Sequence, residues 1–317
     1  MFGSRRSATR SKILGPRYAV SVEFDLPPIR TIDLDGPVSY RCWDGPSETT
    51  FVMVHGLGGA HINWVAVAPG LSGLGRVLAL DLPGFGWSPR AGRGSGLMDA
   101  RRTLSRFMAE LGGGRVVLCG NSMGGGIAAL QAAVDPASVR GLVLSCSVYP
   151  WAGGGSPHPL ILATFGGYRL PLVGERIVTT RMHTMSPERT VRLGFAFTAA
   201  DPATIPREVI LLHEELVAKR QRDPDAVPAF LDAARSLLRL GRRPDIARGA
   251  LDAIQAPVLV LHGRRDRLVP ASFAEAELRR HPGWRGRIFP DLGHVPMLEA
   301  PGRWLSEVAD WHAEQVR

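Results

Sequence analysis

The chain has 317 residues, 45% of them apolar, which suits one large α/β domain with an insertion or two smaller domains. Its net charge of +9 comes mostly from scattered arginines without a nucleic-acid-binding motif, so we expect no nucleic-acid partner and mainly solvated surface charge, with attraction to anionic surfaces or substrates as the alternative. The chain contains no run of about 18 apolar residues, so we expect no membrane span. Its three cysteines cannot all pair with one another, which fits a reducing, cytoplasmic compartment.

Residues 1–28 predict a disordered or extended tail, and the first 25 of them lack the apolar block of a signal peptide. Beyond the tail, the chain alternates between strand-like and helix-like runs up to about residue 150. Two antiparallel edge strands are expected within 29–43. Further strands are expected at 50–54, 76–80, 116–120 and 139–145, and helices at 64–71, 97–111 and 127–133.

The pattern changes after residue 150. Residues 151–245 contain no strand-like run, and their helical pieces are expected at 175–182, 187–197, 206–220 and 226–240. Strands return at 257–261 and 286–289, with helices at 273–280 and 302–316. Alternating strands and helices indicate a parallel sheet, so we predict a core of residues 29–150 and 246–317, interrupted by a helical insertion at 151–245.

The most informative stretch is Gly120-Asn121-Ser122-Met123-Gly124, between a buried strand and an alanine-rich run. A sharp strand-to-helix turn needs glycines where backbones nearly touch, and it would expose the hydroxyl of Ser122 on a strained backbone. The following helix would aim free N–H groups at a nearby negative charge. The stretch therefore predicts an acyl-transfer nucleophile, although a plain tight turn would also place glycines around a serine.

Serine chemistry needs a base and an acid that orients the base. Asp266 follows one predicted strand and His294 follows the last one. The order Ser122, Asp266, His294 is the nucleophile–acid–base order of one hydrolase architecture. The alternatives are a surface ion pair for Asp266, which lies among arginines, and a structural role for His294. Asp291 is too close to His294 along the chain, and Asp81 is expected to stabilise the loop after its own strand.

Five segments, in this order and at these spacings, resemble the α/β-hydrolase fold superfamily over roughly residues 29–314. They are the His55-Gly56 loop, the 81–88 segment, the Gly120–Gly124 elbow, the 263–270 loop with Asp266, and Gly293-His294 with the Glu299 and Pro301 that follow. The resemblance implies a mostly parallel sheet of about eight strands, helices on both faces, and a helical cap inserted after strand six.

The resemblance also implies the roles of the site residues. Ser122 would be the nucleophile, His294 the general base and then acid, and Asp266 the orienting acid. The oxyanion hole would use the backbone N–H groups of Met123 and Leu57, with Gly58 as the competing second donor. His55 is expected to brace that loop rather than react.

A serine nucleophile permits hydrolysis of an ester, thioester, amide or lactone, and we expect a carboxylic ester of a small apolar substrate. The elbow is similar to that of C–C (meta-cleavage product) hydrolases, which makes cleavage of vinylogous diketones the alternative. Two features depart from that subgroup, namely the loop at 55–60 and Val295, where that group usually has tryptophan. A small-molecule receptor that kept the fold is a third interpretation.

No ligand cluster and no phosphate-binding glycine loop is found, so we expect neither a metal nor an organic cofactor. The helical insertion should line the pocket with apolar side chains, for which Trp151 and Phe195 are candidates together with Val295 after the histidine. Further candidates, which could equally be core residues of the insertion, are Phe165, Met182, Met185 and Phe197.

Overall fold

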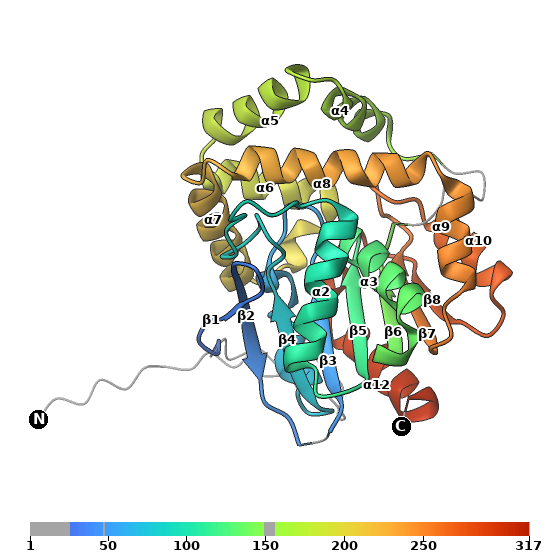
Figure 1. Cartoon of the computed structure of the whole chain (residues 1–317). Coiled ribbons are helices and arrows are strands. Elements are labelled where there is room, and N and C mark those ends of the chain that lie inside the picture. The colour runs from blue at the N-terminus through green and yellow to red at the C-terminus, as the bar shows by residue number, and fades with distance from the viewer. Residues whose placement is uncertain (1–25, 47, 149–155, 317) are drawn as a thin grey trace, which may run out of the picture.

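The computed structural model describes residues 26–46, 48–148 and 156–316 (Figure 1). Nearly all of the predicted tail at 1–28, and Trp151 in the insertion, lie outside the described residues. None of the helices in the described ranges is long and apolar enough to cross a membrane. The three cysteines, Cys42, Cys119 and Cys146, are buried free thiols.

Eight strands in the described ranges form one sheet in the order β1-β2-β4-β3-β5-β6-β7-β8, which confirms the predicted sheet. The pairs β1–β2 and β2–β4 are antiparallel, and all other neighbours are parallel. The strands are β1 (Arg30–Asp33), β2 (Pro37–Trp43), β3 (Thr50–Val54), β4 (Arg76–Leu80), β5 (Val116–Asn121), β6 (Val139–Ser145), β7 (Val258–Gly263) and β8 (Arg285–Phe289). Strands β3, β5 and β7 are buried along their whole length, as expected of continuous apolar runs in the middle of a parallel sheet.

Helices cover both faces of this sheet (Figure 1). On one face, α2 and α3 pack Leu104 and Ile127 against the strands. On the other face, α12 packs Trp304 and Trp311, both fully buried. The core helices are α1 (Ala68–Leu71), α2 (Leu97–Leu111), α3 (Met123–Val134), α10 (Ala271–Arg280), α11 (Pro296–Glu299) and α12 (Pro301–Gln315), with 3-10 turns η1 (His61–Trp64) and η2 (Pro136–Ser138).

Between β6 and β7, the described residues from 156 onward form helices and no strand. These are α4 (Pro159–Arg169), α5 (Val173–Thr184), α6 (Pro187–Thr198), η3 (Pro202–Thr204), α7 (Arg207–Gln221), α8 (Ala226–Gly241) and α9 (Pro244–Asp252). In Figure 1, α4 and α5 lie above α8, at the end of the sheet where the parallel strands finish. Tyr168, Val178 and Leu231 from these three helices form a small separate core.

Several helical segments differ from the prediction. The helix expected at 64–71 is split into η1 and α1, because Pro69 has no N–H to continue the hydrogen-bond ladder. Helices α4 and α9 were not predicted. The pair Gly166-Gly167 inside α4 is unfavourable for an isolated helix, so packing of Tyr168 against α8 supplies what local propensity lacks.

We predict that Gly124→Ala destabilises the fold, since a Cβ at Gly124 would lie 2.2 Å from the carbonyl oxygen of Val54. The expected loss in the free energy of unfolding is about 1–3 kcal/mol or more, the usual cost of overpacking. Chemical denaturation measures it. The control is Gly249→Ala in α9, where a Cβ meets nothing within 4 Å. It should stabilise by about 0.5–1 kcal/mol. Equal effects would show that the contact at Gly124 is not tight.

Candidate active site

Ser122 lies at the turn between β5 and α3 with φ 54° and ψ −120°. This left-handed backbone is unfavourable for a residue with a side chain, so it persists only where the surroundings enforce it. Close backbone contacts supply that constraint: a Cβ at Gly120 would lie 2.4 Å from the carbonyl oxygen of Gly124, and one at Gly56 would lie 3.1 Å from the Cβ of Ser122. The turn has the geometry of a nucleophile elbow.

His294 and Asp266 form a direct hydrogen bond. His294 Nδ1 lies 2.7 Å from Asp266 Oδ2, and both residues are almost completely buried. The other oxygen, Asp266 Oδ1, accepts from the backbone N–H groups of Leu268 at 2.8 Å and Val269 at 3.0 Å. The carboxylate is therefore fixed from two sides, and the hydrogen bond to Nδ1 turns His294 Nε2 away from Asp266.

Burial alone would raise the pKa of Asp266. The charges and hydrogen bonds of His294 and His262 outweigh that effect and hold the pKa of this carboxyl below its ordinary value. Asp266 is consequently ionised at neutral pH, which suits an acid whose task is to stabilise an imidazolium rather than to exchange protons.

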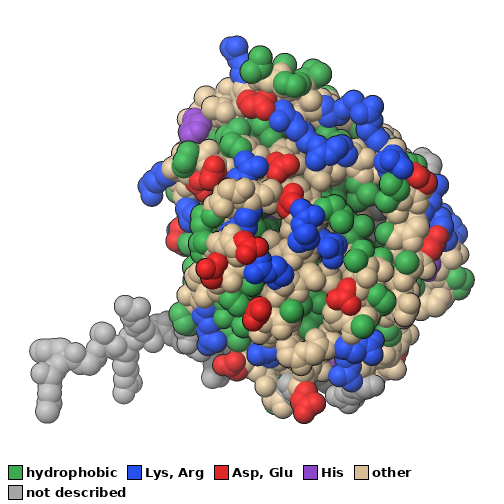
Figure 2. All heavy atoms as spheres, viewed as in Figure 1, with side chains coloured by type: hydrophobic (Ala, Val, Ile, Leu, Met, Phe, Trp, Pro, Cys, Tyr) green, Lys and Arg blue, Asp and Glu red, His purple; other side chains and the backbone are tan. Residues whose placement is uncertain are grey.

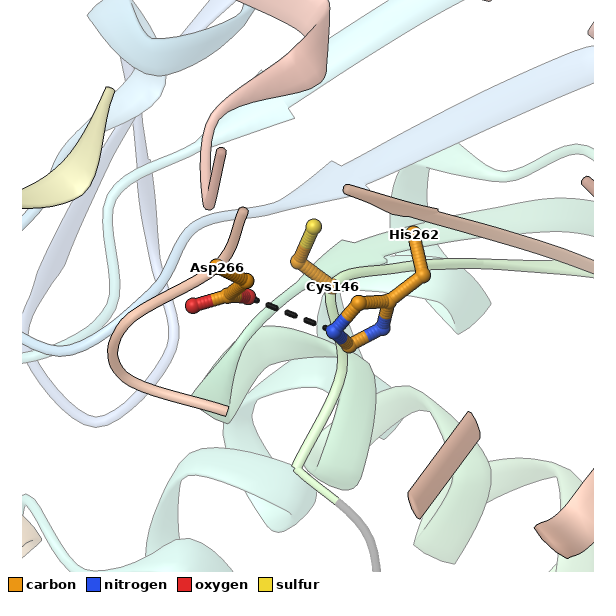
Figure 3. Close-up of side chains that lie close together, drawn as sticks. All are labelled: Cys146, His262 and Asp266. Atoms are coloured by element: carbon orange, nitrogen blue, oxygen red, sulfur yellow. Dashed lines mark ion pairs between the residues drawn. The ribbon is translucent and has the colours of Figure 1, made fainter. Parts of the chain in front are cut away.

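His262, at the end of β7, is a second partner of this carboxylate that the sequence analysis did not assign. Its Nε2 lies 3.3 Å from Asp266 Oδ2 and 2.9 Å from the carbonyl oxygen of Val269 (Figure 3). It therefore contacts the same carboxylate oxygen as His294 Nδ1. Its position in the sequence could have indicated this role, because it lies near the end of a buried strand and four residues before Asp266.

Cys146 completes a buried cluster with His262 and Asp266, whose possible ligand atoms lie within 4.8 Å of one another (Figure 3). A thiol binds a metal as the thiolate. Burial, and next the charge of Asp266, raise the pKa of Cys146 well above its ordinary value. The carboxylate oxygens are also already engaged by histidine and backbone donors. The donor set therefore fits a support for Asp266 better than a metal centre.

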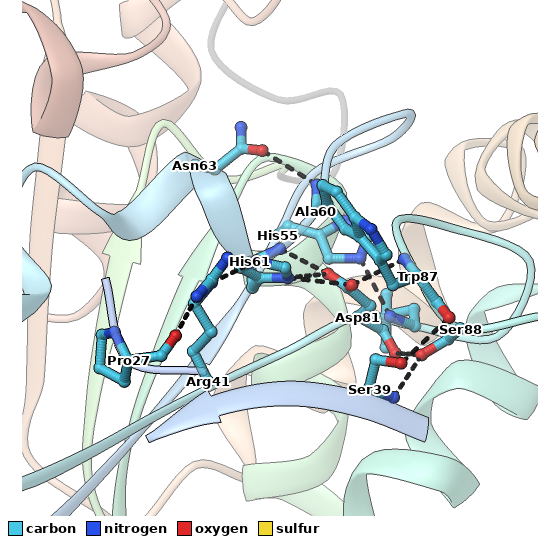
Figure 4. A network of polar contacts seen from close by, with 11 residues as sticks. Pro27, Ser39, Arg41, His55, Ala60, His61, Asn63, Asp81, Trp87 and Ser88 are labelled. Atoms are coloured by element: carbon cyan, nitrogen blue, oxygen red, sulfur yellow. Dashed lines mark hydrogen bonds and ion pairs between the residues drawn. The ribbon is translucent and has the colours of Figure 1, made fainter. Parts of the chain in front are cut away.

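The other two acids considered from the sequence have partners elsewhere. Asp291 is exposed and pairs with Arg303 at 2.6 Å. Asp81 is fully buried and accepts from the backbone N–H of His61 at 2.6 Å and of Trp87 at 2.8 Å (Figure 4). Of the three aspartates, Asp266 is the one in contact with His294.

Asp81 organises the loops beside the elbow, as the sequence analysis expected (Figure 4). His61 Nδ1 lies 3.0 Å from both of its carboxylate oxygens, and Arg41 Nε donates to His61 Nε2 at 2.9 Å. Because Arg41 can only donate, Nε2 of His61 is the acceptor and Nδ1–H donates to Asp81. A chain of three side chains from separate parts of the sequence thus secures this loop.

His55 braces the neighbouring loop. Its Nε2 accepts from the backbone N–H of Leu82 at 3.0 Å, and Nδ1 lies 2.8 Å from the carbonyl oxygen of Gly56. Burial lowers the pKa of His55, so the ring is neutral and provides one donor and one acceptor. Leu57 follows on this loop and lines the same cavity as Ser122.

Met123 is the first residue of α3, so its N–H has no acceptor within the helix. The N–H groups of Gly125 and Gly126 donate to the carbonyl oxygen of Ser122. The remaining N–H at Met123, together with the loop of Leu57 and Gly58, makes this corner suited to hold an oxyanion beside Ser122.

Backbone contacts position the loop of His294. Its N–H donates to the carbonyl oxygen of Thr198, at the end of α6, at 2.7 Å. Asn121 Nδ2 donates to the carbonyl oxygen of His294 at 3.2 Å, which links this loop to the elbow. The buried carboxylate of Glu299 accepts from the N–H groups of Gly293 at 2.9 Å and Ala200 at 2.7 Å. Burial raises the pKa of Glu299, and these backbone donors oppose that shift.

Ser122 and His294 face one cavity of about 920 Å³ between the sheet and the helices that follow β6. Phe195 and Val295, both predicted to contact substrate, line it. The other described apolar candidates also lie on its wall, namely Phe165, Met182, Met185 and Phe197. A largely apolar cavity that holds a serine and a carboxylate-paired histidine is suited to nucleophilic attack on a carbonyl group.

A family model described as the alpha/beta hydrolase fold matches residues 49–301. The chain belongs to this family. A solved thermophilic esterase from Thermogutta terrifontis superposes with a TM-score of 0.65 at 24% identity, over 91% of this chain and 98% of the esterase. At that identity the likeness supports the fold alone.

Curated relatives of the chain include two kinds of hydrolase. It is 28% identical over 263 residues to a pimeloyl-[acyl-carrier protein] methyl ester esterase of Nitrosomonas europaea, covering 80% of this chain and 92% of the esterase. It is 29% identical over 286 residues to a 2-hydroxy-6-oxononadienedioate/2-hydroxy-6-oxononatrienedioate hydrolase of Cupriavidus pinatubonensis, covering 87% and 92%.

The chain is also 31% identical over 258 residues to the dihydrolipoyllysine-residue acetyltransferase component of an acetoin cleaving system from Pseudomonas putida. That match covers 81% of this chain, which spans only 61% of the length of that relative.

We predict that Asp266→Asn slows the reaction of Ser122 with a fluorophosphonate by roughly 10²–10⁴-fold, because the amide favours the wrong histidine tautomer. Asp291→Asn is the matched control, because this exposed aspartate lies on the same loop as His294 but pairs with Arg303. Its rate should stay within about threefold of that of the unchanged protein. The measurement is the rate of phosphonylation, by mass spectrometry, on variants with unchanged circular dichroism spectra. A large loss in Asp291→Asn and none in Asp266→Asn would show that Asp291, and not Asp266, is the acid that orients His294.

Proposed function

We propose that the chain hydrolyses a carboxylic ester of a small apolar substrate through an acyl-enzyme on Ser122. The observation that carries the proposal is the 2.7 Å hydrogen bond from His294 Nδ1 to the buried carboxylate of Asp266, beside a strained serine that faces the same cavity. Membership of the α/β-hydrolase family and the esterase among its relatives support this reaction class.

In the first half-reaction, His294 Nε2 takes the proton of the Ser122 hydroxyl as its oxygen attacks the ester carbonyl carbon. The resulting oxyanion accepts hydrogen bonds from the N–H of Met123 and from Leu57 or Gly58, each worth about 3–4 kcal/mol in such sites. Asp266 stabilises the imidazolium. As the tetrahedral intermediate collapses, His294 gives its proton to the leaving alcohol.

In the second half-reaction, water replaces the alcohol. His294 takes a proton from the water, whose oxygen attacks the acyl carbon on Ser122. Collapse of the second intermediate returns the proton to the serine oxygen and releases the carboxylic acid. No redox or metal chemistry is required for these steps.

We assign substrate choice to a cap domain, the helical segment 151–245, between core parts 29–150 and 246–317. Its described helices contribute Phe165, Phe195 and Phe197 to the cavity wall, while Ser122, Asp266 and His294 come from loops of the sheet. This division separates the groups that react from those that select the acyl chain.

Cleavage of a C–C bond in a vinylogous diketone is the second candidate. The relative from Cupriavidus pinatubonensis and the Gly-Asn-Ser-Met-Gly-Gly form of the elbow favour it. Val295, where C–C hydrolases usually have tryptophan, favours ester hydrolysis instead. Because these observations point in different directions, a panel of substrates has to decide between ester hydrolysis and C–C cleavage.

The deciding experiment compares p-nitrophenyl esters of rising acyl length with one meta-cleavage dienone. We expect ester turnover, and a loss of at least about 10³-fold in Ser122→Ala with the fold unchanged. Ser147→Ala, a buried serine just past the neighbouring strand, should stay within about threefold. Turnover of the dienone alone would replace the proposed reaction with C–C cleavage. If Ser122→Ala hydrolysed the ester as fast as the unchanged protein, Ser122 would not be the nucleophile.

A second test concerns metals. Because the proposed steps use only side chains and backbone donors, dialysis against EDTA should leave kcat/KM for the preferred ester within about twofold. Loss of activity that a divalent ion restores would contradict this assignment.

A further inference from the structure

The charged side chains on the described cavity wall are all positive. Its described lining residues include four arginines and no aspartate or glutamate; the arginines are Arg169, Arg181, Arg220 and Arg242. On the outer surface, by contrast, Figure 2 shows basic side chains interspersed with acidic ones. Several surface arginines are paired, as Arg287 is with Glu307 at 2.7 Å. A hollow lined by one sign of charge attracts ligands of the opposite sign.

Arg220, near the end of α7, is the arginine placed deepest in this arrangement. Its Nη1 donates to the carbonyl oxygen of Gly58 at 2.9 Å, and its guanidinium lies 5.8 Å from the centre of the Phe230 ring. Nε is buried and has no hydrogen-bond partner in the part of the chain that the structure describes. No carboxylate there comes within ion-pair distance of it. Asp223, three residues further along the chain, acts on its charge only from beyond that distance, so the guanidinium has no direct ion pair.

Arg181 adds a second positive charge at the rim. It is exposed and lines the cavity, and while burial raises the pKa of Tyr168, the charge of Arg181 opposes that larger effect. Burial, and next the charge of Arg181, lower the pKa of Arg220 to about 10. Arg220 therefore remains protonated at neutral pH despite its surroundings. An unpaired guanidinium next to apolar side chains is costly unless an anion joins it.

The position of Arg220 relative to Ser122 follows from one short loop. A Cβ at Gly56 would lie 3.1 Å from the Cβ of Ser122, and a Cβ at Gly58 would lie 3.2 Å from Nη1 of Arg220. Gly56 and Gly59 are joined by a turn hydrogen bond of 3.0 Å. The reacting serine and the unpaired guanidinium thus sit at opposite sides of one tight turn, a separation that a short acyl chain can span.

We infer that Arg220, assisted by Arg181, is a carboxylate-binding subsite, and that the preferred substrate is a monoester whose apolar acyl chain ends in a carboxylate. The inference rests on the proposed ester hydrolysis. The planar guanidinium fork matches a carboxylate, and the apolar wall between Arg220 and Ser122 matches a methylene chain. Selection by Arg220 would act on substrate binding and not on the proton transfers of His294.

The test uses p-nitrophenyl monoesters of glutaric, adipic and suberic acids, each paired with its neutral methyl p-nitrophenyl diester. The unchanged protein should prefer the monoester of the best length by at least about tenfold in kcat/KM, mainly through KM. Arg220→Met should lower kcat/KM for that monoester by about 30-fold or more and leave the neutral diester within about threefold. Lys219→Met is the matched control, because it removes one positive charge from α7 outside the cavity lining. It should keep the preference.

Two results would overturn the inference while leaving the ester hydrolase intact: no preference for the monoester in the unchanged protein, or an equal loss on both substrates in Arg220→Met. The second would give Arg220 only the task of holding Gly58. If no ester is turned over, the proposed function fails, and calorimetry with adipate then tests the subsite separately. Binding that is lost in Arg220→Met but kept in Lys219→Met supports it, and no binding, or equal binding in all three proteins, refutes it.

Discussion

The candidate site depends on backbone packing where β5 becomes α3. Gly124 lies against the carbonyl oxygens at the end of β3, and Gly120 lies against the first turn of α3, at distances that leave no room for a Cβ. This contact holds Ser122 at a positive φ that an isolated chain would abandon. It also fixes the loop after β3 beside the serine, so Ser122 and the backbone donors of the proposed oxyanion hole share one constraint.

Around this contact, polar networks link loops from different strand ends, in addition to the apolar packing of residues such as Leu82 and Val295. Asp81 secures the loops on the β4 side through His61 and Arg41, and Asn121 joins the elbow to the loop of His294. Buried polar groups of this kind are costly unless fully satisfied, and when satisfied they fix geometry closely. The site is therefore rigid on the sheet side, while its other wall is formed by helices with their own small core.

Much of the fold and the candidate site could be predicted because the signals are local. Glycines around Ser122, and polar residues just past apolar strands, mark the elbow and the positions of Asp266 and His294. What could not be predicted depends on distant contacts. His262 and His294 contact Asp266 together only once the loops after β7 and β8 meet, and the absence of a direct ion pair at Arg220 among the described residues is visible only when the helices are assembled. Helix α4, with its paired glycines, likewise owes its form to α8.

The bonds from His294 to Thr198 and from Glu299 to Ala200 tie the end of α6 directly to the histidine loop. Helices α4 and α5 contact α8, and together with the turn between them they expose Leu160, Leu172 and Val173 to solvent. The helical segment is consequently anchored unevenly. A change in the length of 198–200 would therefore displace the loop of His294, whereas changes in α4 and α5 would reach that loop less directly.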